Sequence, residues 1–427
     1  MKITGIIAEY NPFHKGHAYH LAQAKAVTGA DYTVVVLSGS FVQRGAPALI
    51  DKYCRAQMAL SEGADLVLEL PSAYACASAE AFAGGAVSLL NGLGCVDALC
   101  FGSECGDLSL LRSYARVLAE EPAAYQDLLR AFLKQGCSFP LARSKALHEY
   151  FSYTADIVPC SLYDKDCRYE SEILNQPNNT LGIEYLKALA LSESSIRPYT
   201  ILRRSAGYHD ASMEAEFASA TAIRSTLLEQ GGDFHTIKNQ LPPKAAAILQ
   251  AYLEHRQPLT PDDFSSILHY QLLASSEEEL ATYTDVSPEL AARMKNLLNE
   301  YRSASSFADL LKTKQLTHTR ITRALCHILL KDKQTDADRR KASGYPVYGR
   351  ILGFCKESQP LLAAIKQSAR IPLISCMADG PALLSDTPEL LALFEQDVFG
   401  SHVYEAAVAA KSKTATCHEY TRQMAVL

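Results

Sequence analysis

The first hundred residues alternate between short apolar runs and segments whose apolar positions recur with helical spacing. The runs predict strands and the segments between them predict helices. Strands that alternate with helices are typical of a parallel sheet covered on both faces, so we predict an α/β fold with a Rossmann-like, doubly wound sheet. Ligands of such sheets bind at the carboxyl ends of the strands. The predicted strands cover residues 3–8, 32–37, 65–70 and 98–101, and the predicted helices cover 17–26, 52–62 and 78–90.

The pattern changes along the rest of the chain. Residues 107–150 read as helical, and a last strand at 198–202 lies between helices at 179–191 and 219–229. Beyond about residue 235 there is almost no strand signal, and apolar residues recur with helical spacing. Three prolines between 235 and 260 mark a junction. We therefore expect a catalytic domain over 1–235 and a mostly α-helical domain over 236–427.

Composition narrows the class of protein. No signal sequence opens the chain, and no apolar run reaches the roughly 18–20 residues that span a bilayer, so we expect a cytoplasmic protein without a membrane partner. The 12 cysteines include no CxxC pair, which argues against a zinc site, and we predict no protein-held metal. The cysteines read as buried free thiols of a reducing compartment.

Charge is unevenly distributed along the chain. The protein carries a net charge of −6, which argues against a generally basic nucleic-acid binder. Residues 301–350 nevertheless hold eleven basic and four acidic side chains, and such a local basic segment is a candidate footprint for a polyanion. An ordinary solvated helix face is the alternative. The candidate contacts are Lys312, Lys314, His318, Arg320 and Arg323.

The strongest chemical signal is the segment NPFHKGH at residues 11–17, directly after the first strand. A turn there places His14 and His17 at the amino end of the following helix, where free backbone N–H groups and the helix dipole favour an anion. Gly16 removes a side chain where a nucleotide must approach the backbone. Together these groups would stabilise charge on a pyrophosphate leaving group.

A second signal is SATAIR at residues 219–224. Ser219 and Thr221 suit the start of a helix, where hydroxyl groups cap the helix and bind phosphate, and Arg224 can clamp oxygens one turn later. A serine-capped surface helix would explain this segment alone. Together with the two histidines, this segment predicts a site that binds a triphosphate from two sides.

Longer strings add a resemblance. The segments EYNPFHKGH, SGSFVQRGAPALIDKYCRAQMAL, GADLVLELP, FGSECGD, QPNNTLGIEY and SATAIRS resemble the bacterial tRNA(Met) cytidine acetate ligase family of the nucleotidylyltransferase superfamily. They span roughly residues 8–225, and LKTKQLTHTRITR is the best match in the carboxyl half. The resemblance implies a HIGH-type nucleotidyltransferase core and an enzyme that activates acetate with ATP, with Mg²⁺, to acetyl-adenylate. The acetyl group then passes to N4 of the wobble cytidine of elongator tRNA(Met).

The resemblance also implies an ATP site, in which His14, His17 and Arg224 are catalytic. The doublets Asn178–Asn179 and Arg203–Arg204 leave the contact residue open, and we follow the first member of each. In the loop after the second strand, Ser38–Gly39 or Arg44 could bind acetate or the target base. Lys52 and Arg55 lie one turn apart on the next predicted helix, and a functional role and a solvated helix face explain them equally well. The implied ATP-binding residues are Ile7, Ala8, Glu9, Tyr10, Asn11, Pro12, Phe13, His14, Lys15, Gly16, His17, Ala18, Tyr19, His20, Gly102, Asn178, Arg203, Ser219, Thr221 and Arg224.

Two other functions remain open from the sequence. A small-molecule adenylyltransferase would use the phosphate site but would leave the basic segment idle. A non-catalytic RNA-binding protein would have a decayed nucleotide site, and the intact motifs argue against it. The expected partners are elongator tRNA(Met) and acetate, while the sequence indicates no protein partner, oligomeric state or tRNA-selecting residues.

Overall fold

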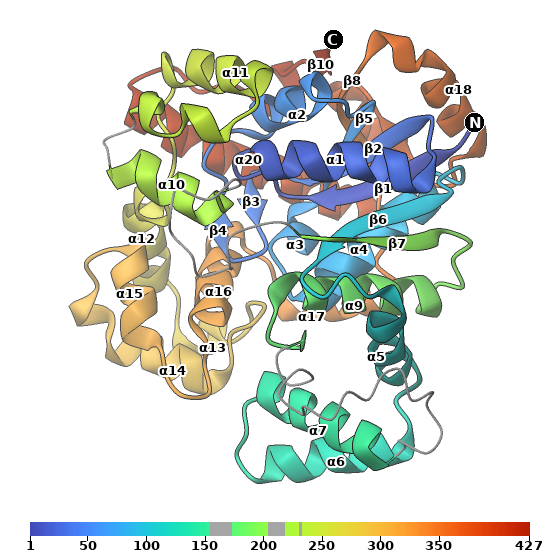
Figure 1. Cartoon of the computed structure of the whole chain (residues 1–427). Helices are drawn as coiled ribbons and strands as arrows, with labels where there is room; N and C mark the ends of the chain where they lie inside the picture. Colours follow the sequence, from blue (N-terminus) through green and yellow to red (C-terminus); the bar gives the residue numbers. More distant parts are fainter. Residues whose placement is uncertain (154–172, 204–217, 230–232) are drawn as a thin grey trace.

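The computed structural model describes residues 1–153, 173–203, 218–229 and 233–427. Its centre is a sheet with the strand order β10-β8-β5-β2-β1-β6-β7, in which β9 also pairs with β8 (Figure 1). The parallel strands follow the sequence order 3-2-1-4-5 of a Rossmann fold, which confirms the predicted fold class. These strands are β1 (Ile3–Ala8), β2 (Tyr32–Ser38), β5 (Leu66–Leu70), β6 (Ala98–Ser103) and β7 (Arg197–Leu202).

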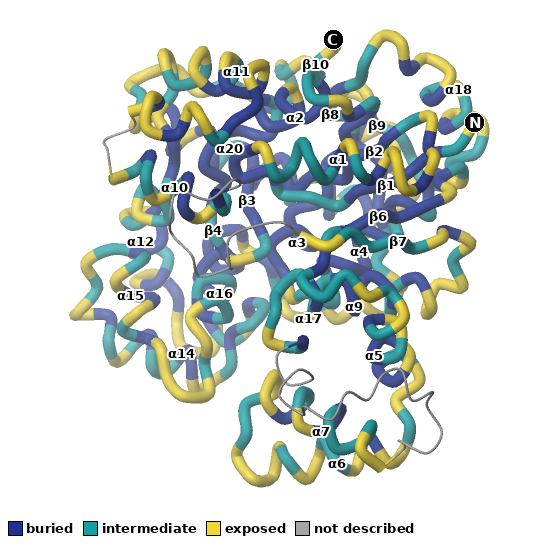
Figure 2. Tube along the Cα trace, viewed as in Figure 1, coloured by how far each residue is buried: buried dark blue, intermediate teal, exposed yellow. Residues whose placement is uncertain are grey.

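Alternate side chains of the central strands enter two separate cores. Val35 and Leu37 of β2 pack with helices α1, α2, α10 and α11, whereas Val34 and Val36 pack with α3, α4, α5 and α9. Burial on both faces explains why these strands are continuous apolar runs, and the sheet is the most buried layer of the molecule (Figure 2). The helices are α1 (Lys15–Thr28), α2 (Lys52–Ser61), α3 (Ser72–Ala75), α4 (Ala79–Gly92), α5 (Leu108–Glu120), α6 (Ala123–Lys134), α7 (Phe139–Tyr153), α9 (Pro177–Leu191), α10 (Ala220–Glu229) and α11 (Pro243–Leu253).

The carboxyl-terminal half is mostly helical, as expected. A third core joins α12, α14, α15 and α16 into a helical lobe beside the sheet (Figure 1). The helices are α12 (Ser265–Ala274), α13 (Glu277–Leu280), α14 (Pro288–Asn296), α15 (Ala304–Leu311), α16 (His318–Leu330), α17 (Gln334–Ala342), α18 (Gln359–Ser368), α19 (Gly380–Leu383) and α20 (Pro388–Ser412). Short 3₁₀ turns lie at η2 (Phe234–Thr236), η3 (Lys238–Gln240), η4 (Pro261–Phe264), η5 (Leu298–Glu300), η6 (Lys356–Ser358), η7 (Met377–Asp379) and η8 (Glu419–Thr421).

The expectation of almost no strands beyond residue 235 was wrong. Three strands from this half extend the sheet, and β8 runs antiparallel to β5, so the sheet is mixed. Arg350 and the glycines Gly349 and Gly353 interrupt the apolar pattern of β8, which hid the strand. The division at residue 235 stays a prediction. The added strands are β8 (Gly349–Phe354), β9 (Leu373–Ile374) and β10 (Ala425–Val426).

Two further features bear on function. A small hairpin, β3 (Phe41–Val42) and β4 (Ala46–Pro47), leaves the sheet after β2 and lies against α16. None of the helices in the described part of the chain combines the length and apolar content that a bilayer-spanning segment requires.

Candidate active site

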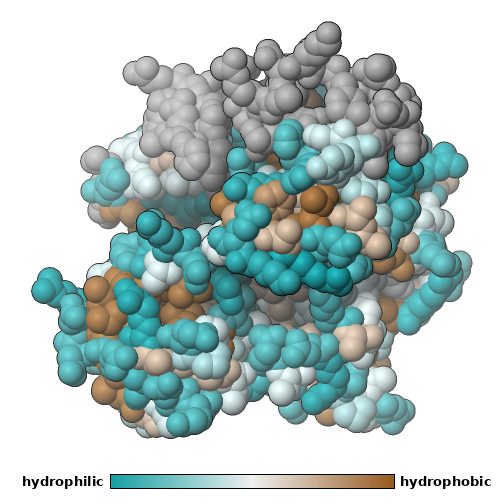
Figure 3. Space-filling view, turned by 90° about the horizontal axis from the view of Figure 1, so that it is seen from below, coloured by the Kyte–Doolittle hydropathy of each residue, from teal (hydrophilic) through white to brown (hydrophobic). Residues whose placement is uncertain are grey.

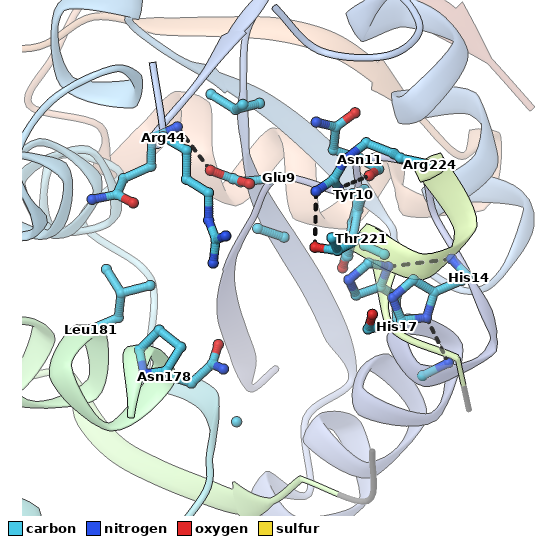
Figure 4. Close-up of a pocket in the computed structure, with 18 of the residues that line it drawn as sticks. Glu9, Tyr10, Asn11, His14, His17, Arg44, Asn178, Leu181, Thr221 and Arg224 are labelled. Carbon is cyan, nitrogen blue, oxygen red and sulfur yellow. Dashed lines mark hydrogen bonds between the residues drawn. The ribbon is translucent and has the colours of Figure 1, made fainter. Parts of the chain in front are cut away.

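A cavity of about 520 Å³ opens at the carboxyl ends of β1, β6 and β7. The amino ends of α1 and α10, the start of α9 and the β3–β4 hairpin complete its walls (Figure 4). Most of the predicted ATP-binding residues line it, but Pro12, Phe13, Lys15 and Ala18 do not. The predicted residues that line the cavity are Ile7, Ala8, Glu9, Tyr10, Asn11, His14, Gly16, His17, Tyr19, His20, Gly102, Asn178, Arg203, Ser219, Thr221 and Arg224.

His14 and His17 cap the start of α1 reciprocally. The Gly16 N–H donates to Nδ1 of His14 over 3.1 Å, and the His14 N–H donates to Nδ1 of His17 over 3.3 Å. The two rings stack with centroids 3.7 Å apart. Sequence reasoning expected free backbone N–H groups here, and the structure corrects this, because the imidazoles accept from two of them. Since Nδ1 is an acceptor in both rings, the neutral tautomer carries its proton on Nε2.

The electrostatics of the cavity keep these rings neutral. Burial, together with the charges of Arg203 and Arg224, lowers the pKa of His14 to about 3. Burial and the neighbouring His14 place the pKa of His17 well below its usual range, and burial lowers that of His20 to about 4. At neutral pH His14 and His17 are therefore hydrogen-bond donors through Nε2–H rather than cations.

The second predicted motif lies next to the two histidines. Ser219 accepts a hydrogen bond from the Ala222 N–H at 3.1 Å and so begins α10. Arg224 donates to the Thr221 hydroxyl at 3.1 Å and to the Asn11 carbonyl at 2.7 Å. The guanidinium is thereby held beside the two histidines, as Figure 4 shows. Two helix amino ends and this arginine create a site with the polarity that phosphate requires.

The segment that follows β1 is fixed at several points. Tyr10 has a φ of 46°, a left-handed conformation that turns the chain at the strand end. The Glu9 carboxylate accepts from the Gln43 N–H at 2.9 Å, and the Asn11 side chain accepts from the Leu49 N–H at 2.7 Å.

Arg55 connects the ends of β1 and β2 through hydrogen bonds. It is fully buried, and its guanidinium donates to the carbonyl oxygens of Ile50, Glu9, Ser38 and Gly39. The alternative of a solvated helix face was wrong for Arg55, because its side chain is fully buried.

Lys52, the other residue of this predicted pair, is also buried. Lys52 forms an ion pair with Glu69 at 2.8 Å and another with Glu419 at 2.7 Å, so it is not on a solvated face either. Ser38 and Gly39 do not line the cavity, whereas Arg44 does. Of the two candidates for acetate or base binding, Arg44 is therefore the one that the geometry places at the site.

The asparagine doublet separates into two environments. Asn178 lines the cavity and donates its amide to Glu104 at 2.6 Å. Asn179 is 1% exposed, and its side-chain oxygen accepts from the backbone N–H groups of Glu104 and Cys105. The geometry thus places Asn178 at the cavity and Asn179 in the turn beneath it.

Gly102 and Arg203 form the wall at the ends of β6 and β7. A Cβ on Gly102 would lie 3.1 Å from Cγ of Arg203, so the absence of a side chain leaves room for this arginine. The Arg203 N–H donates to the Ser103 carbonyl at 3.0 Å, which continues the strand pairing. The alternative Arg204 lies outside the described residues.

Sequence reasoning missed several walls of the cavity. Apolar and aromatic side chains from α4, β6 and α9 form one side, and the segment before η4 forms another. No motif marks these positions, because ordinary core residues become lining residues only when the tertiary structure brings them to the strand ends. They are Phe82, Phe101, Leu181, Tyr185 and the segment 259–261.

The basic candidates for tRNA contact lie around the start of α16. Lys312 and Lys314 are exposed, and Arg320 is half-buried. Arg323 differs, because its side chain is only 13% exposed and its Nε donates to Asp285 at 2.9 Å. The surface seen from below is mostly hydrophilic, with small separate hydrophobic patches (Figure 3).

This basic region adjoins the cavity through the β3–β4 hairpin. The Thr322 hydroxyl of α16 donates to the Arg44 carbonyl at 2.6 Å. Gly45 has a φ of 71° and packs so closely on the backbone of Thr322 and Arg323 that a Cβ would collide with it. The hairpin therefore connects the cavity wall to the helix that carries Arg320 and Arg323.

Within the ranges that the structure describes, no three His, Cys, Asp or Glu side chains are arranged to hold a metal ion. The charged groups of the cavity suit an anionic ligand instead.

Comparison with known proteins agrees with this geometry. The sequence profile of the HIGH Nucleotidyl Transferase family matches residues 1–419. The tRNA(Met) cytidine acetate ligase of Alkaliphilus metalliredigens is 39% identical over 96% of this chain and 95% of its own length. That of Acetivibrio thermocellus is 35% identical over the full length of both chains. The crystal structure of Thermotoga maritima TmcAL bound with α-thio ATP superposes with a TM-score of 0.91, at 32% identity and full coverage of both chains.

The two motifs at the start of α1 and α10, the Rossmann strand order and these full-length matches agree with one another. The chain belongs to the HIGH nucleotidyl transferases and, within them, to the tRNA(Met) cytidine acetate ligase family.

Proposed function

We propose that this protein activates acetate with ATP and transfers the acetyl group to N4 of the wobble cytidine of elongator tRNA(Met). The observation that supports this most is the cavity in which the starts of α1 and α10 present neutral imidazoles and Arg224 to one space. An anionic chain of phosphates fits such a wall. The relatives named above are cytidine acetate ligases, which supplies the second substrate and the acceptor.

In the first step, an acetate oxygen attacks the α-phosphorus of ATP and pyrophosphate leaves. His14 and His17 would donate Nε2–H to the phosphate oxygens, and Arg224 would add a charge-assisted donor. Ser219 and Thr221 hold the start of α10 against the same oxygens. Catalysis of this kind depends on positioning and charge stabilisation, and requires no covalent enzyme intermediate.

The adenosine part would lie along the wall made by Gly102, Asn178 and Arg203, at the ends of β6 and β7. The carboxylate of acetate would pair with Arg44, the exposed arginine of the hairpin turn. Mg²⁺ would be held by phosphate oxygens and water, because the described residues form no carboxylate cage, and it would reduce the negative charge of the phosphates.

For tRNA we propose the region around Lys312, Lys314 and Arg320. Contacts of this type position RNA through its phosphates without reading its sequence. Arg323 is the weakest member of the predicted set, because its pairing with Asp285 makes it a structural residue of α16.

The decisive assay incubates the protein with ATP, labelled acetate and purified tRNAs, and measures acetyl-AMP and N4-acetylcytidine. We expect both products, and pyrophosphate release that depends on acetate. Acetate-independent pyrophosphate release with a nucleotide monophosphate as acceptor would favour a small-molecule adenylyltransferase. Binding of tRNA without turnover would favour a non-catalytic RNA-binding protein.

The tRNA surface has its own test. Replacing Lys312, Lys314 and Arg320 by glutamine should weaken tRNA binding and reduce the slope of log K against log salt by about 2–3, if each side chain neutralises one phosphate. Acetyl-AMP formation without tRNA is the internal control and should not change. An unaltered salt slope would exclude this surface.

A further inference from the structure

Glu9 is an unexpected residue in a phosphate-binding cavity. Among the described residues that line it, Glu9 supplies the sole carboxylate, whereas Arg44, Arg203 and Arg224 supply positive charge. A carboxylate repels a triphosphate and also repels acetate. Within the protein its charge acts on Arg224 and its oxygen accepts from the Gln43 N–H. Toward a ligand it suits a group that a carboxylate attracts, and the reaction proposed above provides one, the exocyclic amine of cytidine.

The position of Glu9 is well defined. It directly follows β1 and lies between Arg44 on one side and Arg224 on the other (Figure 4). The backbone N–H of Gln43 donates to Oε1, and Arg55 donates to the main-chain carbonyl at 2.7 Å. Both the carboxylate and the backbone of Glu9 are thus held in place. A general base requires such a fixed position, because it must accept a proton from one direction.

The other candidates for accepting a proton from the amine are the histidines of the cavity. Nδ1 of His14 and of His17 accepts a backbone N–H, and Nε2 of each neutral ring carries the proton. Neither ring presents a free lone pair to an amine. His20, one turn further along α1, is the remaining imidazole of the cavity, and its buried Nε2 has no hydrogen-bond partner within the described residues.

We propose that Glu9 is the general base of the acetyl transfer step. N4 of cytidine attacks the carbonyl carbon of acetyl-adenylate, a C–N bond forms, and the bond from that carbon to the phosphate oxygen breaks, which releases AMP. The amine proton passes to the Glu9 carboxylate and from there to solvent. This inference rests on the proposed function, but it assigns the Glu9 carboxylate to the second half-reaction alone, in place of the ATP contact that the resemblance implied for this residue.

The test separates the two half-reactions in Glu9→Gln, which keeps the oxygen that accepts from Gln43. Acetate-dependent exchange of pyrophosphate into ATP reports adenylate formation. Single-turnover transfer from preformed acetyl-adenylate to tRNA reports the second step. We expect exchange within about threefold of the wild type, and transfer slower by about 10²–10⁴-fold, the usual contribution of a general base. Glu277→Gln, an exposed residue of α13, is the matched control and should leave both rates unchanged.

Hydroxylamine gives an independent readout. It is a strong nucleophile that attacks acyl-adenylates without a base, so Glu9→Gln should form acetyl hydroxamate at the wild-type rate. Equal loss of exchange and transfer, or a loss of exchange that added Mg²⁺ restores, would overturn the proposal and assign Glu9 to ATP binding. Loss of transfer in His20→Gln with normal transfer in Glu9→Gln would overturn it in favour of His20. Absence of acetyl-AMP in the wild type would instead refute the proposed function itself.

Discussion

The neutrality of His14 can be tested directly by replacing it with asparagine. Asparagine is a good helix cap, so His14→Asn keeps an acceptor for the Gly16 N–H while it removes the titrating ring. If the ring is neutral because it is buried between arginines, the variant should change how stability depends on pH. At pH 7.5 the two proteins should differ by no more than about 1 kcal/mol, the usual effect of a changed cap.

The expected size follows from the pKa of His14, which burial, Arg203 and Arg224 lower to about 3 from an ordinary 6.5. The folded protein then binds fewer protons than the unfolded chain between these two values. Stability from the neutral ring is present above pH 6.5 and is lost as the pH falls toward 3. From pH 7.5 to pH 5 the loss is about 2 kcal/mol, at 1.36 kcal/mol for each pH unit below 6.5.

Urea unfolding followed by far-UV circular dichroism measures this difference, since the chain contains no tryptophan. The wild type should lose about 2 kcal/mol more than His14→Asn between pH 7.5 and 5. NMR of the imidazole C2–H resonances gives a second measurement, and the resonance that disappears in the variant should not shift between pH 5 and 8. Equal losses in both proteins, or a His14 resonance that titrates near 6.5, would refute the electrostatic argument.

Four further substitutions test the contacts of individual residues. Gly45→Ala should lower acetate-dependent pyrophosphate exchange as well as tRNA acetylation, because a Cβ would collide with the backbone of Thr322 and Arg323 and displace the hairpin that carries Arg44; unchanged exchange would contradict this. Arg55→Lys should lower the free energy of unfolding by about 3 kcal/mol or more, since an ammonium cannot reach all four carbonyls, and thermal melting would show it. Asn178→Ala should raise the KM for ATP without changing the melting temperature, whereas Asn179→Ala should lower the melting temperature by a loss of about 2 kcal/mol.

The amino-terminal half of the fold was predictable because its strands are buried on both faces. Such strands are continuous apolar runs, and helices with recurring apolar positions separate them. The predicted boundaries differ from the observed ones by one or two residues at most elements, as at α1, which begins at Lys15 rather than His17. Helix ends depend on capping contacts, which a periodic pattern does not encode.

Strand β8 could not be predicted for a physical reason. Arg350 is the second residue of this strand and is 2% exposed, which is unfavourable unless the charge is paired. The partners are Glu69 on β5 and Glu419 near the end of the chain, far away in sequence. A charged residue stabilised by long-range ion pairs reads as an exposed residue until the fold is known. The positions of Lys52, which is also ion-paired, and of Arg55, which donates to four carbonyl oxygens, were left open because their partners likewise have no local signal.

The site was predicted where local motifs carry it, and was incomplete where it depends on tertiary contacts. The start of α1 and the start of α10 lie in one cavity, as the paired motifs suggested. The support that Arg55 gives to the strand ends, and the contact of Gly45 with α16, have no local signature. Each is a single residue whose partner lies elsewhere in the fold.

The reciprocal cap changes how anion binding at α1 is understood. A bare helix end binds an anion with its own N–H groups, but here the amides of Gly16 and His14 donate to imidazole nitrogens. Each ring accepts at Nδ1 and therefore presents Nε2–H. The anion then contacts a neutral imidazole donor, and that imidazole in turn accepts from the backbone at the helix end. Two fixed donors without net charge can stabilise charge that grows on pyrophosphate during the reaction. Unlike a pair of cations, they add no net positive charge that would attract the product pyrophosphate once it has formed.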